Sequence, residues 1–228
     1  MRRLAHDDVS STIDRAPTPA TTGEVLHWAA RYDLLVWLLT LGRERRFREK
    51  VAGLARLAPG ESVLDVGCGT GTLAIEAKRR VGPSGTVYGI DASPEMIARA
   101  RTKAKKAGAD VVFETAVVEA LPFQDARFDA ILTSLVLHHL PRTARPQCAR
   151  EMRRVLKPGG RLLAVDLGGG EQPRRGVLAH LHRHGRFDLR DVVPVLSEAG
   201  LSSVEGGAVG FLNLQFVLAV APGGAATR

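Results

Sequence analysis

The chain has 228 residues, of which 45% are hydrophobic and 25% are charged. This composition excludes a disordered or fibrous protein and is typical of one domain with a substantial core. The net charge of +8 favours anionic partners such as lipid headgroups, nucleic acids or acidic metabolites, without choosing among them. The two cysteines cannot form a disulfide framework, so we expect a reducing, cytoplasmic location.

The N-terminal quarter of the chain differs from the rest in composition. Residues 1–22 are polar and end in a stretch rich in proline and threonine, so we expect a flexible tail without a signal peptide. Two helical patterns follow within 23–58, where we expect a helical lid. Its apolar run, 34–41, is shorter than the ~20 residues that a membrane span needs, but it could contact an anionic membrane peripherally. The basic run 43–50 is expected to be a solvated helix face.

Strand and helix patterns alternate from residue 59 to residue 221. Such alternation predicts an α/β domain in which helices cover both faces of a parallel sheet, a Rossmann-like three-layer sandwich. The expected strands are 63–66, 86–91, 111–114, 128–133, 160–167, 202–205 and 211–220. The expected helices are 71–81, 94–107, 142–156 and 189–199. Residues 222–228 are expected to form a short tail.

A glycine-rich turn after the first of these strands gives the strongest functional signal. It places glycines at alternate positions, Gly67, Gly69 and Gly71, two residues after Asp65. Glycine can adopt positive φ and lets a ligand approach where a Cβ would collide. A dinucleotide-binding turn has the spacing G-x-G-x-x-G, and the Asp65 carboxylate would repel a phosphate. The turn therefore favours a ligand that carries a cationic amine.

The second expected strand ends in Asp91, about 20 residues after the glycine-rich turn. A carboxylate at this spacing binds ribose hydroxyls in Rossmann-like folds. The alternative is that Asp91 caps the helix that begins at Pro94, but Ser93 is already a good N-cap residue. We therefore expect Asp91 to bind a ribose.

Motifs between residues 27 and 167 resemble, in order and spacing, those of the small-molecule class I S-adenosylmethionine-dependent methyltransferases. The motifs are the glycine-rich turn, 89–96, 119–123, 137–140 and 154–161. Residues 30–35 and 41–48 resemble the N-terminal helices of the ubiquinone/menaquinone-biosynthesis methyltransferases. The resemblance implies a seven-stranded, mostly parallel sheet whose last strand is antiparallel and lies between the fifth and sixth. It also implies S-adenosylmethionine as cofactor and a small lipophilic acceptor, such as a quinone, a lipid or a secondary metabolite.

The resemblance also implies which residues hold the cofactor. These are Tyr32, Asp65, Gly67, Cys68, Gly69, Thr70, Gly71, Asp91, Ala92, Met96, Val118, Glu119, Thr133 and Ser134. Tyr32 would close over the methionine end of the cofactor, although it could equally be a core aromatic residue. Val117 stands where relatives often have an acid that holds the adenine amine. Adenine must then be held by backbone groups near Val118 or by Glu119, whose alternative role is to cap the short helix after it.

Two adjacent histidines, His138 and His139, follow strand 128–133 at the carboxyl edge of the expected sheet, where ligands bind. An imidazole with a pKa of about 6.5 can accept a proton at neutral pH. Carbon and oxygen acceptors need such a base, whereas amines and thiolates do not. We expect one of the two histidines to be the base, with packing or capping of the loop as the alternative.

Other readings of the sequence remain open. A nucleic-acid methyltransferase would suit the positive charge, but strand 128–133 does not end in the Asn/Asp-Pro-Pro-Tyr/Phe motif of base amino methyltransferases, so we do not expect nucleic acid as a partner. A non-catalytic, cofactor-binding partner subunit is the third possibility. His180, His182 and His184 alternate, but no cysteine or carboxylate cluster accompanies them, so no metal site is expected. The sequence does not indicate an oligomeric state.

Overall fold

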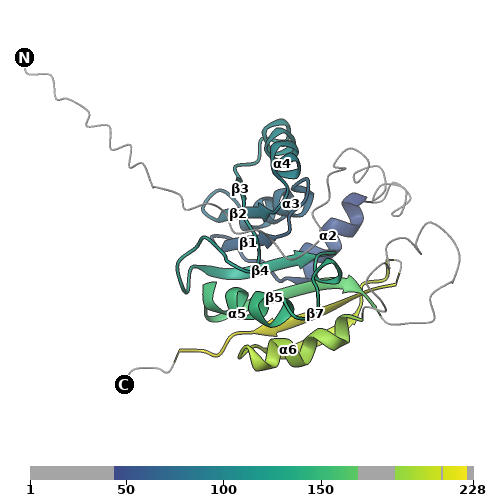
Figure 1. The fold of residues 1–228 in the computed structure, drawn as a ribbon. Coiled ribbons are helices and arrows are strands. Elements are labelled where there is room, and N and C mark those ends of the chain that lie inside the picture. Colours follow the sequence, from purple (N-terminus) through teal and green to yellow (C-terminus); the bar gives the residue numbers. More distant parts are fainter. Residues whose placement is uncertain (1–43, 169–187, 212, 225–228) are drawn as a thin grey trace, which may run out of the picture.

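The computed structural model describes residues 44–168, 188–211 and 213–224, which form a central sheet with helices on both sides (Figure 1). The expected tail 1–22, most of the expected lid 23–58 and part of the tail 222–228 lie outside the described residues. Tyr32 and the three alternating histidines also lie outside them.

The described residues form a seven-stranded sheet in the order β3-β2-β1-β4-β5-β7-β6. The strands are β1 (Ser62–Val66), β2 (Thr86–Asp91), β3 (Val112–Thr115), β4 (Phe128–Ser134), β5 (Leu156–Leu167), β6 (Ser202–Ala208) and β7 (Leu214–Val220). Neighbouring strands are parallel from β3 to β5, while β7 runs antiparallel to both β5 and β6. The predicted fold class, including the antiparallel last strand between the fifth and sixth, is confirmed.

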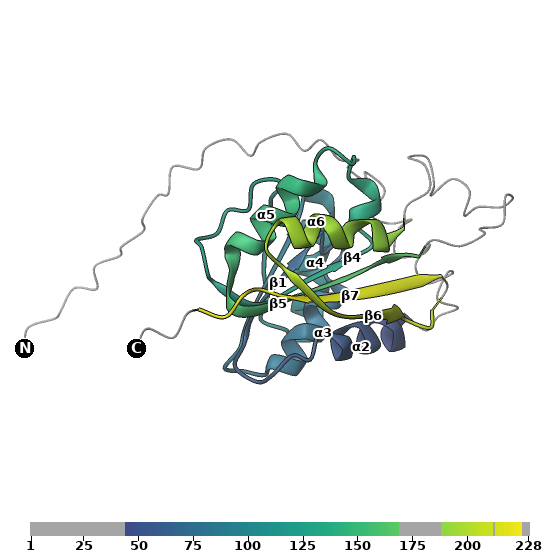
Figure 2. The same ribbon diagram turned by 90° about the horizontal axis from the view of Figure 1, so that it is seen from below.

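The helices divide between the two faces of this sheet (Figure 2). The α-helices within the described residues are α2 (Glu44–Leu54), α3 (Thr72–Val81), α4 (Pro94–Ala107), α5 (Arg145–Val155) and α6 (Val193–Glu198). One cluster of buried side chains packs α2, α3 and α4 onto the sheet, and a second cluster packs α5 and α6 onto the opposite face. The central strands β1 and β4 are thus buried on both sides, and nearly all of their residues are buried.

Several of the expected element boundaries differ from the structure. Strand β5 begins at Leu156 rather than 160, and strand β7 begins at Leu214 rather than 211. The expected helix 189–199 is a 3-10 turn, Leu189–Val192, followed by the short helix α6, because Pro194 has no N–H to continue a regular helix through the junction. Helix α5 begins at Arg145 rather than 142, with Pro146 in its first turn. Strand β6 continues to Ala208, whereas the sequence pattern ended at 205.

Helix α2 is the described part of the expected lid, and it packs into the core of the domain. Phe47 and Val51 on this helix are buried in the same cluster as α3 and α4. At its C-terminal end, the Arg161 side chain of β5 donates hydrogen bonds to the carbonyl oxygens of Ala55 (2.6 Å) and Arg56 (2.8 Å). Packing against α3 and hydrogen bonds from β5 therefore hold α2 in a fixed position beside the sheet.

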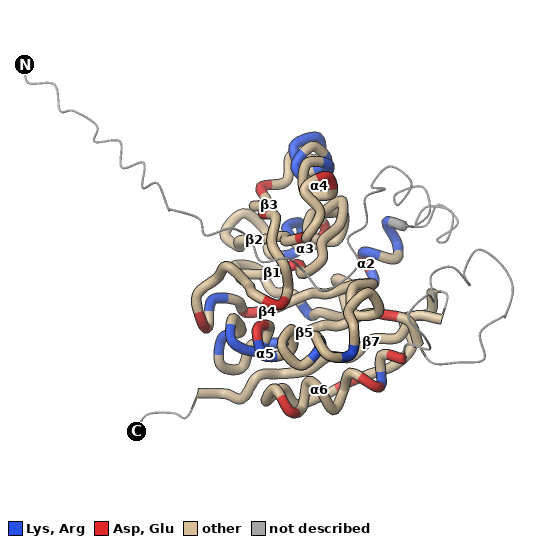
Figure 3. Tube along the Cα trace, in the orientation of Figure 1, with Lys and Arg blue, Asp and Glu red and all other residues tan. Residues whose placement is uncertain are grey.

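The charge of the molecule is unevenly distributed over these elements (Figure 3). Lysines and arginines are prominent on the outer part of α4 and along α5. Among the described residues, no helix is both long enough and apolar enough to cross a membrane.

Candidate active site

The glycine-rich turn lies at the carboxyl end of β1, in the middle of the sheet. Gly67, Gly69 and Gly71 all have positive φ angles, of 67°, 53° and 79°. A Cβ on Gly67 would lie 2.3 Å from Cγ2 of Val136, and one on Gly71 would lie 2.7 Å from Cζ of Phe113. At these two positions the protein's own side chains fill the space that the sequence interpretation reserved for a ligand.

Hydrogen bonds from neighbouring elements hold the turn in place. The Cys68 N–H donates to the Ile90 carbonyl oxygen (2.8 Å), and Gly71 N–H donates to the Cys68 carbonyl oxygen (2.9 Å). From α4, the ammonium group of Lys103 donates to the hydroxyls of Thr70 (2.7 Å) and Thr72 (2.9 Å). Burial raises the pKa of the Cys68 thiol, so this cysteine stays neutral. The turn is thus tied to both β2 and α4.

Asp65, at the end of β1, is the buried carboxylate of the site. Only 1% of its surface is exposed, and within the described part of the chain its Oδ2 accepts no hydrogen bond. Burial raises the pKa of Asp65 to about 7, while the nearby Arg48 guanidinium and the Ala74 N–H act in the opposite direction. A buried carboxylate oxygen of this kind fits a ligand that brings an ammonium group.

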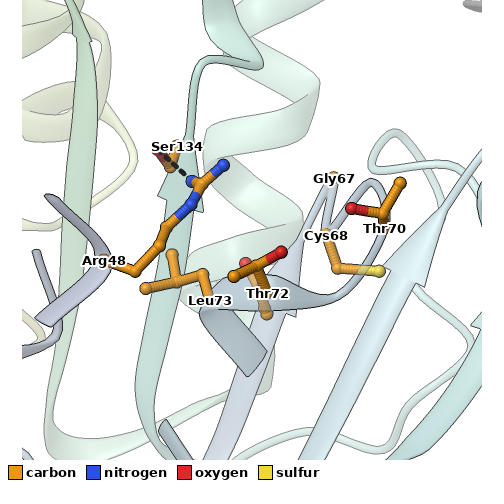
Figure 4. A pocket seen from close by; sticks show the side chains of 8 residues that line it. Arg48, Gly67, Cys68, Thr70, Thr72, Leu73 and Ser134 are labelled. Atoms are coloured by element: carbon orange, nitrogen blue, oxygen red, sulfur yellow. Dashed lines mark hydrogen bonds between the residues drawn. The ribbon is translucent and has the colours of Figure 1, made fainter. Parts of the chain in front are cut away.

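Arg48 extends from α2 across a pocket toward Ser134 at the end of β4 (Figure 4). Its Nη1 lies 3.5 Å from the Ser134 hydroxyl oxygen, and the side chain is buried. The pocket is lined by Arg48, Asp65, Gly67, Cys68, Thr70, Thr72, Leu73 and Ser134. A cation and a carboxylate therefore face the same small space, which suits the two charged ends of an amino acid.

The prediction that the whole run 43–50 is a solvated helix face was wrong for Arg48. Arg45, on the outer face, behaves as predicted and pairs with Glu49 at 2.7 Å, four residues later. Arg48 instead lies on the buried stripe of α2, four residues before Ala52 and seven before Ala55, both of which are buried. This helical spacing was the available signal, because residues four apart share a helix face.

Asp91 sits at the end of β2 and organises the glycine-rich turn. Its Oδ2 accepts a hydrogen bond from Gly69 N–H and its Oδ1 accepts one from Ser93 N–H, both at 2.9 Å. Ser93 caps α4, since its hydroxyl accepts from Met96 N–H at 3.4 Å. Burial raises the pKa of Asp91, and the two backbone hydrogen bonds oppose that shift. Each carboxylate oxygen has a second lone pair available in principle for a ribose hydroxyl.

The segment expected to hold adenine follows β3 and lies beside Asp91. Ala116 N–H donates to the Asp91 carbonyl oxygen at 3.1 Å, and Val118 is buried among the core residues of β1 and β2. The residues after Glu119 form a turn rather than the expected short helix. The Leu121 N–H donates to the Glu151 carboxylate of α5 at 2.8 Å, so Glu151 rather than Glu119 holds this backbone group.

The remaining expected site residues lie at the end of β4 and in the loop after it. Thr133 and Ser134 are buried at the strand end, where Thr133 lies opposite Val66 of β1 and the Ser134 hydroxyl lies near Arg48. Leu135 has a positive φ of 62° and turns the chain into a 3-10 turn, Leu137–His139. There Nδ1 of His138 lies 2.7 Å from Oδ1 of Asp166, a fully buried residue of β5.

Asp166 was missed from the sequence, although a signal for it exists. It is a charged residue within the otherwise apolar carboxyl half of β5, and its pairing with His138 spans 28 residues. The structure thus places Asp65, Asp91, Arg48 and the His138–Asp166 pair along one edge of the sheet. Among the described residues, no group of three histidine, cysteine or acidic side chains could hold a metal ion.

This edge, with a glycine-rich turn after β1 and an acid after β2 in a sheet of order 3-2-1-4-5-7-6, defines the class I S-adenosylmethionine-dependent methyltransferases. A family model described as a methyltransferase domain matches residues 63–160. The crystal structure of a methyltransferase of this type from Aquifex aeolicus has a TM-score of 0.70 and 26% identity, with 84% of this chain and 97% of that chain covered.

Sequence similarity to known proteins shows to which family within this class the chain belongs. The demethylmenaquinone methyltransferase of Thermus thermophilus is 36% identical over 81% of this chain and 79% of its own length. The ubiquinone/menaquinone biosynthesis C-methyltransferase of Geobacter sulfurreducens is 38% identical over 74% of this chain and 63% of its own length. The chain belongs to the methyltransferase family that includes these quinone-biosynthesis enzymes. It spans 58% of the length of a further relative, from Bordetella avium.

Proposed function

We propose that the protein transfers a methyl group from S-adenosylmethionine to a small, lipophilic, quinone-like acceptor in the cytoplasm. The observation that carries this proposal is the pocket beside the glycine-rich turn, where the buried Asp65 carboxylate and the Arg48 guanidinium face one small space. The quinone-like acceptor is supported by relatives whose names specify ubiquinone, menaquinone and demethylmenaquinone.

The residues on this edge fit the parts of the cofactor in order. Asp65 would hold the ammonium group of its methionine end, Arg48 the carboxylate and Asp91 the ribose hydroxyls. The backbone near Val118, or the Glu119 side chain, would hold the adenine. Thr133 and Ser134 would line the space between the methionine end and the acceptor. When bound, the cofactor supplies a methyl group that its sulfonium has already activated.

The protein's main task is then to position the acceptor. Holding two reactants in line can contribute ~7–11 kcal/mol to lowering the barrier. The loop after β4 is the segment that would face the acceptor, because it leaves the sheet beside the glycine-rich turn. His138 and His139 on this loop are the candidates for a general base, which contributes typically ~10²–10⁴-fold when the acceptor must lose a proton.

Incubation with methyl-labelled S-adenosylmethionine and reduced demethylmenaquinone tests this function. We expect label in the quinone fraction, and in a lipid extract we expect it in quinones rather than phospholipids. DNA and RNA in parallel reactions should stay unlabelled. Calorimetry should show binding of S-adenosylhomocysteine and none of NAD. Label in nucleic acid, or binding of NAD without S-adenosylhomocysteine, would contradict the proposal.

A further inference from the structure

Two side chains of α5 hold the backbone of the segment that follows β3. A carboxylate oxygen of Glu151 accepts a hydrogen bond from Leu121 N–H at 2.8 Å. The Arg154 guanidinium donates to the carbonyl oxygens of Leu121 (3.0 Å) and Phe123 (2.7 Å). The same guanidinium donates two hydrogen bonds to Glu151, both at 2.8 Å. Hydrogen bonding to Arg154 lowers the pKa of Glu151, so the carboxylate stays ionised and the network stays intact at neutral pH.

A third side chain of the same helix face joins these two. Gln147 lies four residues before Glu151 and seven before Arg154, so the three side chains share one face of α5. The Gln147 Nε2 donates to the Glu119 carbonyl oxygen at 3.2 Å. The buried face of α5 belongs to the hydrophobic core, which gives the helix a fixed position. One rigid element therefore holds the backbone of residues 119–123 at several points.

Val118, which we propose to lie beside the adenine, immediately precedes this held segment. It is only 7% exposed, yet none of the hydrogen bonds among the described residues involves its N–H or its carbonyl oxygen. Since backbone polar groups in buried places nearly always have partners, these two groups are suited to a ligand. On the other side of Val118, Ala116 N–H donates to the Asp91 carbonyl oxygen at 3.1 Å. Val118 is thus held between β2 and α5.

We infer that Gln147, Glu151 and Arg154 are positioning residues for the base of the cofactor, because they fix the main chain where that base binds. This inference rests on the proposed function and adds to it the residues that set recognition of the base. The three side chains act through the backbone that they hold. Val117 offers no side-chain acceptor for the adenine amine, so recognition depends on how accurately the main chain is placed.

A fixed main-chain N–H selects a base by its hydrogen-bonding pattern. N1 of adenine accepts a hydrogen bond, whereas N1 of hypoxanthine, the 6-oxo analogue, carries a proton. An N–H held in place at Val118 therefore favours adenine, because with hypoxanthine two donors would face each other. If α5 did not hold the segment, the N–H could move away from N1–H and this preference would fall.

Calorimetry with three ligands that share ribose and homocysteine tests this inference. S-adenosylhomocysteine carries adenine, S-inosylhomocysteine carries hypoxanthine, and S-ribosylhomocysteine has no base. The wild-type protein should prefer the adenine ligand over the hypoxanthine ligand by at least about tenfold. Glu151→Ala and Arg154→Ala should each weaken the adenine ligand by at least about tenfold and reduce that preference to below about threefold. Both variants should bind S-ribosylhomocysteine within about twofold of wild type, because it makes no contact through a base.

Matched variants separate positioning from loss of structure. Glu151→Gln keeps an acceptor oxygen for Leu121 N–H and should restore most of the affinity for S-adenosylhomocysteine. Arg153→Ala removes one positive charge from the same helix and should bind all three ligands as wild type does. Thermal denaturation shows which variants are folded. Gln147→Ala, which removes one exposed side chain, should still weaken only the ligands with a base, by about threefold, even if Arg154→Ala does not fold.

The outcomes distinguish this inference from the proposed function. Equal losses for S-adenosylhomocysteine and S-ribosylhomocysteine would overturn the inference, because they would show a general disturbance of the site. An unchanged preference for adenine in folded Glu151→Ala and Gln147→Ala would also overturn it, while the cofactor assignment would stand. If the wild-type protein binds none of the three ligands, the proposed function fails and this inference fails with it.

Discussion

The ionised Asp65 carboxylate is less stable in the folded protein than in the unfolded chain, and a bound cationic ligand would offset this difference. Its pKa is raised from 3.8 to about 7, so the folded state binds more protons than the unfolded state between these values. The free energy of unfolding therefore falls as the pH rises through this window, and the loss is complete above about pH 7. At neutral and higher pH, the residue that we propose to bind the cofactor, Asp65, thus lowers the stability of the cofactor-free protein.

We predict that Asp65→Asn raises the melting temperature of the cofactor-free protein at pH 8 and leaves it nearly unchanged at pH 4, where the wild-type carboxyl is also neutral. The same variant should bind S-adenosylhomocysteine at pH 8 with a free energy weaker by ~1.5–3 kcal/mol, the range for a hydrogen bond to a charged group. Thermal denaturation and calorimetry measure the two effects. A lower melting temperature together with unchanged affinity would show that Asp65 has a purely structural role.

Arg48 provides a second prediction at the residue scale. Arg48→Met should weaken the binding of S-adenosylmethionine by about 10–100-fold, because a charged partner of its carboxylate is lost. Arg45→Met on the exposed face of the same helix, where 84% of the side chain is exposed, is the matched control and should bind as wild type does. With decarboxylated S-adenosylmethionine, wild type and R48M should bind equally. A difference that persists with this ligand would assign Arg48 to another group.

The sequence predicts the strands, helices and turns of the domain more completely than the contacts between side chains from distant segments. Strand β1, the turn after it and Asp91 form a local pattern, because glycine spacing and an acid at a strand end are read from neighbouring residues. The pairing of His138 with Asp166 and the position of Arg48 over the pocket depend on how β5 and α2 pack beside β4. The spacing of Arg48 along α2 and the isolated charge of Asp166 in β5 mark each residue as unusual, but only the packing of these elements shows which groups they meet.

Helix α3 shows how strictly the turn before it is specified. Gly71, its N-cap, has a φ of 79°, and a Cβ there would meet Phe113 Cζ at 2.7 Å and Ala100 Cβ at 2.9 Å. Gly108, at the end of α4, has a φ of 60°, but a Cβ there would meet nothing within 4 Å. The two glycines share the left-handed conformation and differ in the space around them.

We therefore predict that Gly108→Ala lowers the free energy of unfolding by ~1–2 kcal/mol, the strain of a left-handed alanine. Gly71→Ala should lower it by a further ~1–3 kcal/mol, because the methyl group overpacks the contact between α3, α4 and β3. Urea denaturation of both variants gives the comparison. Equal losses would mean that backbone strain alone makes glycine necessary at Gly71.

At the scale of the whole molecule, the excess of positive charge would help the protein to reach a lipophilic acceptor that lies in an anionic membrane. The net charge is +8, and basic side chains are prominent on α4 and α5 (Figure 3). Phosphate headgroups attract such a surface over distances of about a Debye length. We propose that peripheral contact with an anionic membrane brings the site to its acceptor.

The corresponding prediction is that the protein sediments with vesicles containing anionic lipid at low salt and is released at high salt. Neutral vesicles of the same size are the control and should retain much less protein. Methylation of a vesicle-embedded hydroquinone should fall with the same salt dependence. If the protein ignores anionic vesicles and yet methylates a water-soluble quinol at full rate, the acceptor is met in solution.

The hydrogen bonds around the glycine-rich turn have a consequence for how quickly the site can be filled. Asp91 holds Gly69, and Lys103 holds Thr70 and Thr72. All of these partners belong to the protein's own chain, so folding rather than binding orders the turn. A ligand then loses little affinity to loop ordering, because preorganisation removes that cost of binding. A spent cofactor can therefore be replaced by a new one without the turn having to order again in every cycle.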